Sequence, residues 1–430
     1  MMQIAPGVLA RCLGPLGQRA AAATRRALSY IPEPDDTPLY NEQLCAPNRV
    51  QQVNVVQLDK LVRQASLPRL VDSAAFLTSQ LPARLENHVS RLQALLPSCG
   101  AELSDLLSAS AESKSGVLEV SRDWGLLDRA SPEGLRHFES HLAGFKERVE
   151  GEFTRLMTGA RQLAGQPGWW QRDGDVAALN QALDLTHWYV LGLRLMLTQH
   201  SAALHALDSS SKAAAAAAHP PDHRGPATSG GFLEPPRPGH APPPPSSMIE
   251  RAAPLRQVLQ HVSEDVRAFC VEKNSAAPEV EIVGGEGLRL PLVAPYFEFM
   301  VSEILKNATQ AVVTRFGAWD VDEADPVRIQ ISEPADDPNN VLVSITDRGL
   351  GVPADHFRGM FFWFWSSNKP LLGGYGYSRT HGSPMHGLGA GVPVSRVLAH
   401  FMGGQASWET SSFHLHTTVE IRLPKQGFVF

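Results

Sequence analysis

Residues 207–248 divide the chain into two parts with different patterns, and no other feature constrains the fold as strongly. The segment (LDSSSKAAAAAAHPPDHRGPATSGGFLEPPRPGHAPPPPSSM) consists mainly of Ala, Pro, Gly and Ser. Such a composition buries too little apolar surface to offset the entropy of ordering the chain. We therefore expect a disordered insertion or linker over 207–248, with one folded domain on each side.

Composition supports two globular domains and excludes several classes of protein. The chain has 430 residues, 43% of them hydrophobic, and a net charge of −6, which fits two soluble domains plus tails. Its basic residues are scattered, so nucleic acid is not an expected partner. No run of 18 apolar residues predicts a membrane span. Four cysteines without a C-x-x-C pair argue against a disulfide framework and against a zinc site.

The first 32 residues have the composition of a targeting segment. They contain four arginines with Ala, Leu and Ser, and no acidic residue occurs before Glu33. This pattern is typical of a mitochondrial transit peptide, which we predict for 1–32. The alternative is an Ala-rich disordered tail.

Helical periodicity dominates the part before the break. Long amphipathic segments at 69–96, 132–164 and 176–206 are interrupted by few strand-like alternations. The economical prediction is an antiparallel helix bundle over 48–206. Pro82 is expected to kink its helix or to mark its end.

The part after the break, 249–430, alternates between the two periodicities. Helices are predicted at 249–273, at 297–315 and after Gly391, and strands at 279–283, 326–333, 341–346, 405–410 and 415–423. This alternation predicts an α/β sandwich in which helices cover one mixed sheet.

Three polar motifs occur in order within this second part. The amphipathic run 301–315 carries Glu303, Lys306 and Asn307 away from its apolar side, so a carboxylate and an amide on neighbouring turns can serve a metal-bound nucleotide. A solvated helix face is the alternative. Next, DRGLG (347–351) follows a β-rich run, and GLGAG (387–391) opens a helix. Glycines at a helix N-terminus present free N–H groups to phosphate oxygens.

Together these motifs resemble the GHKL (Bergerat-type) ATP-binding fold of histidine kinases, DNA gyrase and MutL-type proteins. KNATQAV, DRGLGVP and SPMHGLGAGVPVSRVLAHFMGG look most like the mitochondrial 2-oxoacid dehydrogenase kinases, of the branched-chain and pyruvate types. The resemblance is specific over about 295–425, moderate over 65–206, and absent from the leader and the linker. It implies an enzyme that uses ATP and Mg²⁺ in the mitochondrial matrix.

The resemblance implies roles for individual residues. Glu303 is the general base, Asn307 is the Mg²⁺ ligand, and Lys306 beside it is assigned to the nucleotide. Asp347 accepts the adenine amino hydrogen in a pocket shaped by neighbouring glycines, and the other residues assigned to the nucleotide are Gly349, Gly351, Ser366, Ser367, Gly387, Leu388, Gly389, Ala390, Gly391 and Thr417. A mobile ATP lid is expected over 354–386, although its aromatic run 361–365 is assigned mostly to the core.

His200 ends LGLRLMLTQH, which resembles the end of a long bundle helix in these kinases. The resemblance implies that His200 lies near Glu303 and tunes its basicity. The alternative is a histidine that only complements the helix C-terminus. The chain also departs from the family pattern: Tyr189 and Val190 replace a Ser-Arg pair, and Gln310 replaces an arginine.

The function that this resemblance implies is that of a protein serine kinase that inactivates the decarboxylase subunit of a 2-oxoacid dehydrogenase complex. The lipoyl-bearing core of the complex is the expected docking partner, and a homodimer is expected. SPMHG at 383–387 looks like the matching segment of the branched-chain kinases, and the end at Phe430 lacks the extended tail of the pyruvate type. By resemblance, both features favour the branched-chain type over pyruvate dehydrogenase kinase. The alternatives are a histidine kinase and a noncatalytic nucleotide-binding regulator.

Overall fold

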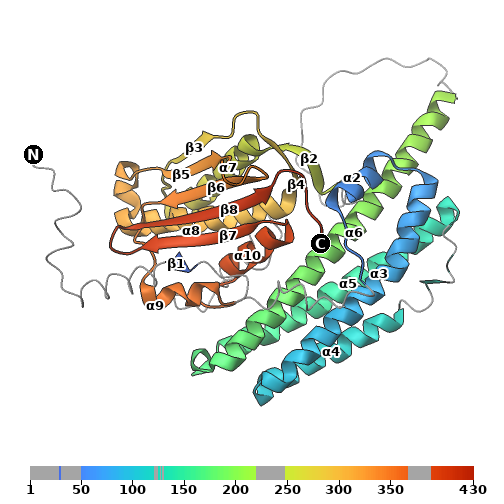
Figure 1. Ribbon diagram of the computed structural model, residues 1–430, viewed down its shortest axis with the longest axis horizontal. Helices are drawn as coiled ribbons and strands as arrows, with labels where there is room; N and C mark the ends of the chain where they lie inside the picture. The colour runs from blue at the N-terminus through green and yellow to red at the C-terminus, as the bar shows by residue number, and fades with distance from the viewer. Residues whose placement is uncertain are drawn as a thin grey trace, which may run out of the picture.

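The protein is described by a computed structural model over residues 29–30, 50–120, 124–125, 127, 130–218, 247–366 and 389–430. A bundle of long helices lies beside a domain built on a β-sheet (Figure 1). The predicted transit peptide lies outside the described residues except for strand β1 (Ser29–Tyr30). Most of the predicted linker and lid also lie outside them.

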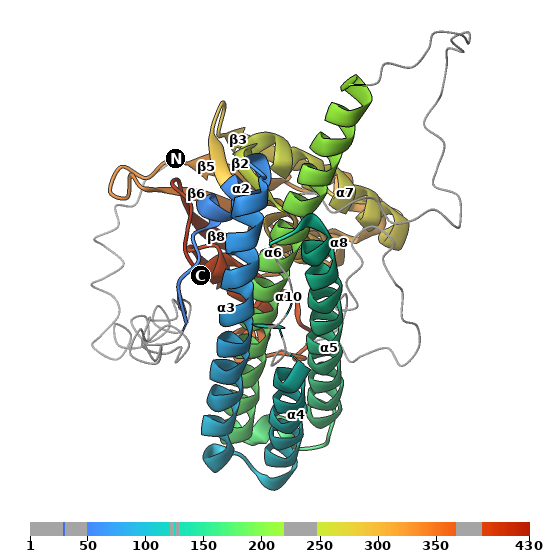
Figure 2. The same cartoon turned by 90° about the vertical axis from the view of Figure 1, so that its right-hand side faces the viewer.

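The first domain is the predicted helix bundle. Its long helices run side by side in Figure 2, and their bounds are α3 (Leu67–Leu95), α4 (Ala101–Val120), α5 (Pro132–Ala164) and α6 (Asp173–Ala218). The shorter α2 (Val55–Arg63) packs on α6. Apolar residues recur at helical spacing, as in Leu70, Leu77, Leu81 and Leu85 of α3, and these side chains are buried. Their shared burial is the main stabilising term of the bundle.

A kink or a helix end was expected at Pro82, and the structure excludes the end, because α3 continues through this residue. One expectation about the bundle was wrong. Helix α6 continues to Ala218, so residues 207–218 are helical and not part of a linker. The run 213–218 is all alanine, the residue with the highest helix propensity, which extends a helix already stabilised by packing.

The second domain contains the predicted mixed sheet. The strand order is β1-β7-β8-β6-β5-β3, with β3 parallel to β5 and all other pairs antiparallel. The strands are β3 (Val280–Gly284), β5 (Val327–Ser332), β6 (Asn340–Asp347), β7 (Gln405–Ser411) and β8 (His416–Pro424). Buried and more exposed residues alternate along β5 and β6, so one face of the sheet receives helices.

Helices α7 (Leu255–Asn274), α8 (Ala294–Asp320) and α10 (Gly391–Phe401) belong to this domain, and α8 packs against both of the others. One correction concerns its first element. Residues 249–254 were expected to begin a helix, but they form β2 (Ile249–Pro254), which pairs with the unpredicted β4 (Arg289–Val293). Pro254 removes an N–H donor and restricts Ala253 to extended backbone, so the helix begins only at Leu255.

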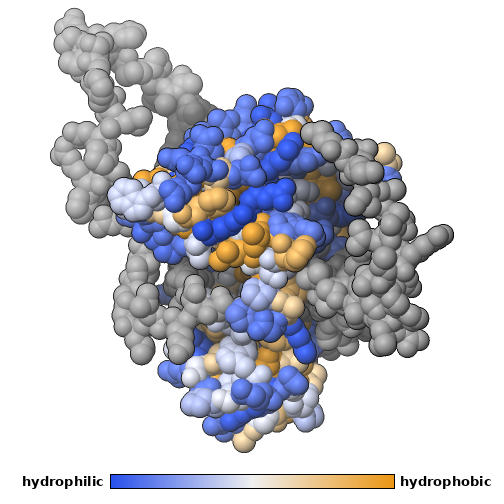
Figure 3. All heavy atoms as spheres, turned by 90° about the vertical axis from the view of Figure 1, so that its left-hand side faces the viewer, coloured by the Kyte–Doolittle hydropathy of each residue, from blue (hydrophilic) through white to orange (hydrophobic). Residues whose placement is uncertain are grey.

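The two domains share an apolar interface and several hydrogen bonds. The last residue, Phe430, exchanges backbone hydrogen bonds with Val53 and lies against Gly192 of α6. Near the start of α8, the Tyr296 hydroxyl donates to the Leu191 carbonyl of α6 at 2.8 Å. The end of the sheet domain that faces away from the bundle is mainly hydrophilic (Figure 3).

None of the described helices is both long enough and apolar enough to cross a membrane.

Candidate functional site

Glu303 lies in the middle of α8, and its carboxylate faces the start of α10. The side chain is largely buried, with a relative exposure of 8% for the residue. It forms an ion pair with Lys306, one turn later on the same helix. A Cβ built on Gly391 would come within 2.6 Å of Glu303 Oε2. The absence of a side chain at Gly391 therefore leaves room for this carboxylate.

Asn307 and Lys306 occupy the turn that follows Glu303. Asn307 is exposed, whereas Lys306 is only partly accessible. Burial lowers the pKa of Lys306, and the neighbouring Glu303 carboxylate acts in the opposite direction. Carboxylate, ammonium and amide groups thus lie within two turns of α8, in the order that the sequence motif predicted.

Asp347 ends β6 and lies below the loop formed by the glycine motif. Its Oδ1 accepts a hydrogen bond from Gly349 N–H at 2.8 Å, and Thr417 N–H also donates to the carboxylate. Burial raises the pKa of Asp347 to about 6 despite these two donors. A buried carboxylate with a raised pKa is common at functional sites, which fits the adenine-binding role that the resemblance implies for Asp347.

Neighbouring strands and glycines bring the other predicted pocket residues to Asp347. Thr417 is paired with Asp347 in the sheet register, and its Oγ1 lies 3.1 Å from Thr410 Oγ1. A Cβ on Gly349 would lie 2.5 Å from Ala311 Cβ of α8, and one on Gly351 would lie 2.5 Å from the Ser411 carbonyl. Both glycines are therefore required by close backbone approach.

The described part of the second glycine motif begins at Gly389. Gly389 is in the left-handed region (φ 71°), Ala390 is buried, and Gly391 is the first residue of α10. The Phe364 N–H donates to the Gly389 carbonyl at 3.0 Å, which ties this turn to the aromatic segment 361–365. Gly387, Leu388 and Ser367 lie outside the described residues, and Ser366 is exposed at the end of the aromatic segment.

Gly389→Ala should destabilise the protein strongly. The new Cβ would lie 2.3 Å from the Trp365 carbonyl oxygen in a backbone conformation that disfavours L-residues. We expect a loss of about 3 kcal/mol or more in unfolding free energy, because strain and overlap add. Gly287→Ala is the matched control: its φ is also positive (73°), but nothing lies within 4 Å of the added Cβ. Equal losses in the two variants, measured by denaturant unfolding, would contradict the predicted overlap.

The structure does not join His200 to Glu303. His200 is completely buried in the bundle, where its Nδ1 lies 2.9 Å from Ser73 Oγ and its ring packs edge-on against Phe138. Its Nε2 has no hydrogen-bond partner among the described residues. Burial lowers its pKa to about 4. Neither ring nitrogen is hydrogen-bonded to Glu303, because α6 turns this side chain toward α3 and α5. The role of His200 in tuning Glu303 stays a prediction.

A buried polar cluster beside the site was not predicted from the sequence. Asp184 of α6 forms an ion pair with Arg396 of α10 and accepts a hydrogen bond from Trp363 Nε1 at 2.7 Å. Phe361 and Trp363 are buried, which confirms that the aromatic run belongs mostly to the core. Asp184 and Arg396 are 212 residues apart, and no local pattern could have paired them.

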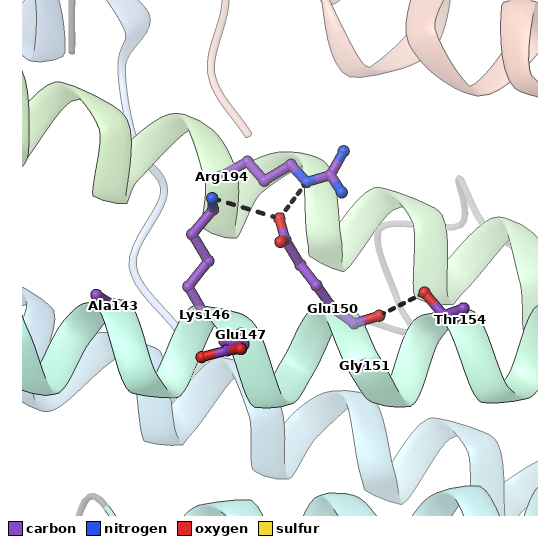
Figure 4. A pocket seen from close by; sticks show the side chains of 7 residues that line it. All are labelled: Ala143, Lys146, Glu147, Glu150, Gly151, Thr154 and Arg194. Atoms are coloured by element: carbon purple, nitrogen blue, oxygen red, sulfur yellow. Dashed lines mark hydrogen bonds and ion pairs between the residues drawn. The ribbon is translucent and has the colours of Figure 1, made fainter. Parts of the chain in front are cut away.

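A separate hollow of about 440 Å³ lies between α5 and α6 (Figure 4). Its centre is Glu150, whose Oε1 lies 2.6 Å from Arg194 Nε and 3.8 Å from Lys146 Nζ. The three side chains are all partly exposed, so each pair contributes about 1 kcal/mol at most. These contacts link two bundle helices, and we assign the hollow no ligand.

Comparison with known proteins agrees with this geometry. Residues 294–427 match the family described as "Histidine kinase-, DNA gyrase B-, and HSP90-like ATPase". A mitochondrial pyruvate dehydrogenase (acetyl-transferring) kinase of Arabidopsis thaliana is 28% identical over 351 residues, which cover 78% of this chain and 80% of the relative. The Drosophila melanogaster protein of the same name is 24% identical over 342 residues, covering 77% of this chain and 72% of the relative.

The matches therefore extend through both domains, and the ATPase domain contains Glu303, Asn307, Asp347 and the α10 glycines. Residues 294–427 thus form a domain similar to the histidine kinase-, DNA gyrase B- and HSP90-like (GHKL) ATPases, and the chain as a whole is similar to mitochondrial pyruvate dehydrogenase kinases.

Proposed function

We propose that this chain is an ATP-dependent protein serine kinase that inactivates a 2-oxoacid dehydrogenase complex in the mitochondrial matrix. The observation that carries the proposal is the position of the Glu303 carboxylate, at the N-terminus of α10 and beside Lys306. A base at this position can meet a hydroxyl group that attacks a phosphate bound by α10. The relatives' names and the Arg-rich, acid-free leader support the mitochondrial location.

In the proposed reaction Glu303 accepts the proton of a substrate serine while the serine oxygen attacks the γ-phosphorus of ATP. The new O–P bond forms as the bond to the β-phosphate oxygen breaks, so ADP leaves. Backbone N–H groups at Gly389–Gly391 and the positive end of α10 would bind the phosphate oxygens. Asp347 would accept the adenine amino hydrogen. Each group performs positioning or charge stabilisation, as phosphoryl transfer requires.

The donor set fits Mg²⁺ held jointly by the protein and the nucleotide. Asn307 offers one exposed amide oxygen, and no cluster of three or more His, Cys, Asp or Glu in the described part of the chain could hold a metal ion. Mg²⁺ in kinases has few protein ligands and takes its other oxygens from phosphates and water. When bound, the ion would neutralise phosphate charge during transfer.

The choice of complex is the finer part of the proposal. The sequence favoured the branched-chain type through SPMHG, a motif that lies outside the described residues. The relatives instead carry the name pyruvate dehydrogenase kinase, and we therefore propose the decarboxylase subunit of pyruvate dehydrogenase as the first substrate to test. Docking on the lipoyl-bearing core and a homodimer belong to the same proposal.

Radiolabelled ATP with each purified dehydrogenase complex tests the function. We expect acid-stable label on a serine of a decarboxylase subunit and loss of dehydrogenase activity. Faster labelling of the branched-chain complex would reverse the substrate preference. Acid-labile label on the kinase itself would identify a histidine kinase and overturn the proposal.

A noncatalytic nucleotide-binding regulator is the second candidate, and specific side chains favour it. Gln310, in place of the family arginine, accepts a hydrogen bond from Asn274 at 3.3 Å, and Val190 is buried in the bundle. Neither residue offers a cation to a substrate. ATP binding without transfer to either complex would support this candidate.

Nucleoside affinity should depend on pH through Asp347. The carboxylate must be ionised to accept two N–H donors and the adenine amino group, and its pKa in the free protein is about 6. Affinity should therefore rise with pH through this value and be about tenfold weaker at pH 5 than at the plateau. Adenosine is the suitable probe because it has no titrating phosphate. A flat calorimetric affinity between pH 5 and 7.5 would contradict the role of Asp347.

A further inference from the structure

One turn of helix α6 holds two segments of the ATPase domain. The Asp184 carboxylate is almost completely buried and forms the ion pair with Arg396 of α10. Its other oxygen accepts the Trp363 indole N–H at 2.7 Å. One turn earlier, Asn180 Oδ1 accepts the Trp363 backbone N–H at 2.8 Å. A bundle helix is thus hydrogen-bonded to α10 and to the aromatic segment at the same place.

Both hydrogen-bond partners of Asp184 are connected structurally to the turn that begins α10. Arg396 is five residues after Gly391 on one short helix, so a displacement of Arg396 displaces the helix N-terminus. Trp363 precedes Phe364, whose N–H binds the Gly389 carbonyl, and the next carbonyl, that of Trp365, lies against Gly389. The conformation of the Gly389–Gly391 turn therefore depends on how α6 holds these two residues.

Stability alone does not account for a charged pair at this interface. Burial raises the pKa of the Asp184 carboxyl, and the Arg396 charge and the Trp363 N–H only counteract it. Apolar residues of similar volume are often as stabilising as a buried ion pair, or more so. An ion pair does, however, fix direction and distance between the elements that carry it.

We propose that Asp184 is a positioning residue that couples the bundle to the nucleotide site. It aligns α10 and the segment 363–365 on α6, and so places the Gly389–Gly391 turn opposite Glu303. Ordering of that turn by nucleotide should in return make α6 more rigid around Asp184, because coupling between two sites is reciprocal. This inference rests on the proposed nucleotide site and extends it to the bundle.

Asp184→Asn and Trp363→Phe in the full-length chain test the proposal. The first removes the charge that faces Arg396, and the second removes the indole donor together with part of the ring. We expect each variant to bind a nonhydrolysable ATP analogue more weakly, by about tenfold for Asp184→Asn and less for Trp363→Phe. Hydrogen exchange should show analogue-induced protection of α6 around 180–195 in the wild type, and this protection should be lost in Asp184→Asn.

Asp208→Asn is the matched control. It makes the same chemical change on the same helix, at a partly exposed pair with Arg136 (3.1 Å) that involves no residue of the ATPase domain. Affinity and protection should remain as in the wild type. The double variant of Asp184 and Trp363 should lose less affinity than the sum of the single losses, because both act through one carboxylate.

Wild-type affinity and protection in a folded Asp184→Asn variant would overturn the proposal. If that variant does not fold, Trp363→Phe decides, and unchanged affinity with unchanged α6 protection would overturn it. A double variant whose loss of affinity equals the sum of the two single losses would also overturn the proposal. All these measurements use nucleotide alone and need no protein substrate. If the proposed function is wrong but this inference is right, the coupling will be observed while no phosphate is transferred to a dehydrogenase complex.

Discussion

Glu303→Gln should lower phosphoryl transfer by about 10²–10⁴-fold, the usual contribution of one general base. Glutamine keeps the shape of the side chain beside Gly391 but cannot accept a proton from the substrate. Affinity for ATP should stay close to that of the wild type, because Glu303 is proposed to act on the substrate hydroxyl and is not among the groups proposed to bind the nucleotide. Initial rates with a purified dehydrogenase complex and calorimetric titration with Mg-ATP measure the two quantities.

The control for this variant is Glu112→Gln, which makes the same change at an exposed position of α4. It should leave both rate and affinity unchanged. Glutamine at position 303 also weakens the ion pair with Lys306, and this change could lower the transfer rate by itself. Lys306→Met separates the possibilities: it removes the ion pair and leaves the base. Near-normal transfer by Glu303→Gln would exclude Glu303 as the base.

The sequence predicted the ATPase domain well because its elements are marked by local patterns. The alternation of apolar and polar residues predicted the ends of β5 and β6 to within about one residue, and the glycine motif predicted the start of α10. The same local signals placed Glu303, Asn307 and Asp347 in one domain. The two-stranded sheet β2–β4 was missed because its strands are short and pair only with each other across 35 or more residues.

Long-range contacts explain which features near the site could not be predicted from the sequence. His200 was assigned near Glu303 from a resemblance at the end of a helix, but its orientation depends on Ser73 and Phe138, which belong to other helices. The Asp184–Arg396 pair was invisible for the same reason. A sequence motif specifies which groups are present, whereas packing between helices decides which of them meet.

Helix α6 illustrates a different kind of error. Alanine in the run 213–218 was counted as low-complexity linker because Pro, Gly and Ser follow it. A helix that is already nucleated by a packed bundle gains one hydrogen bond for each further alanine. Composition therefore placed the end of α6 too early, before a run of strong helix formers. The change in pattern between the two domains was real.

Asn307→Ala should abolish detectable binding of Mg-ATP, which corresponds to a loss of at least about 100-fold when a metal ligand is removed. Asn307 is exposed on α8, so the substitution should leave the fold intact. The loss should be specific for the metal complex: adenosine, which needs only the Asp347 pocket, should bind with unchanged affinity. That contrast distinguishes a missing metal ligand from a damaged site.

The matched control is Asn339→Ala, an exposed residue between β5 and β6 that uses its backbone carbonyl, and not its amide, to bind Lys425 N–H. It should bind Mg-ATP as the wild type does. Titration with Mg²⁺ at fixed ATP adds a second test, because the Asn307 variant should need a much higher Mg²⁺ concentration for any residual binding. Unchanged Mg-ATP affinity in Asn307→Ala would show that the metal ion is held elsewhere, and the phosphate site would then depend on α10 and Lys306 alone.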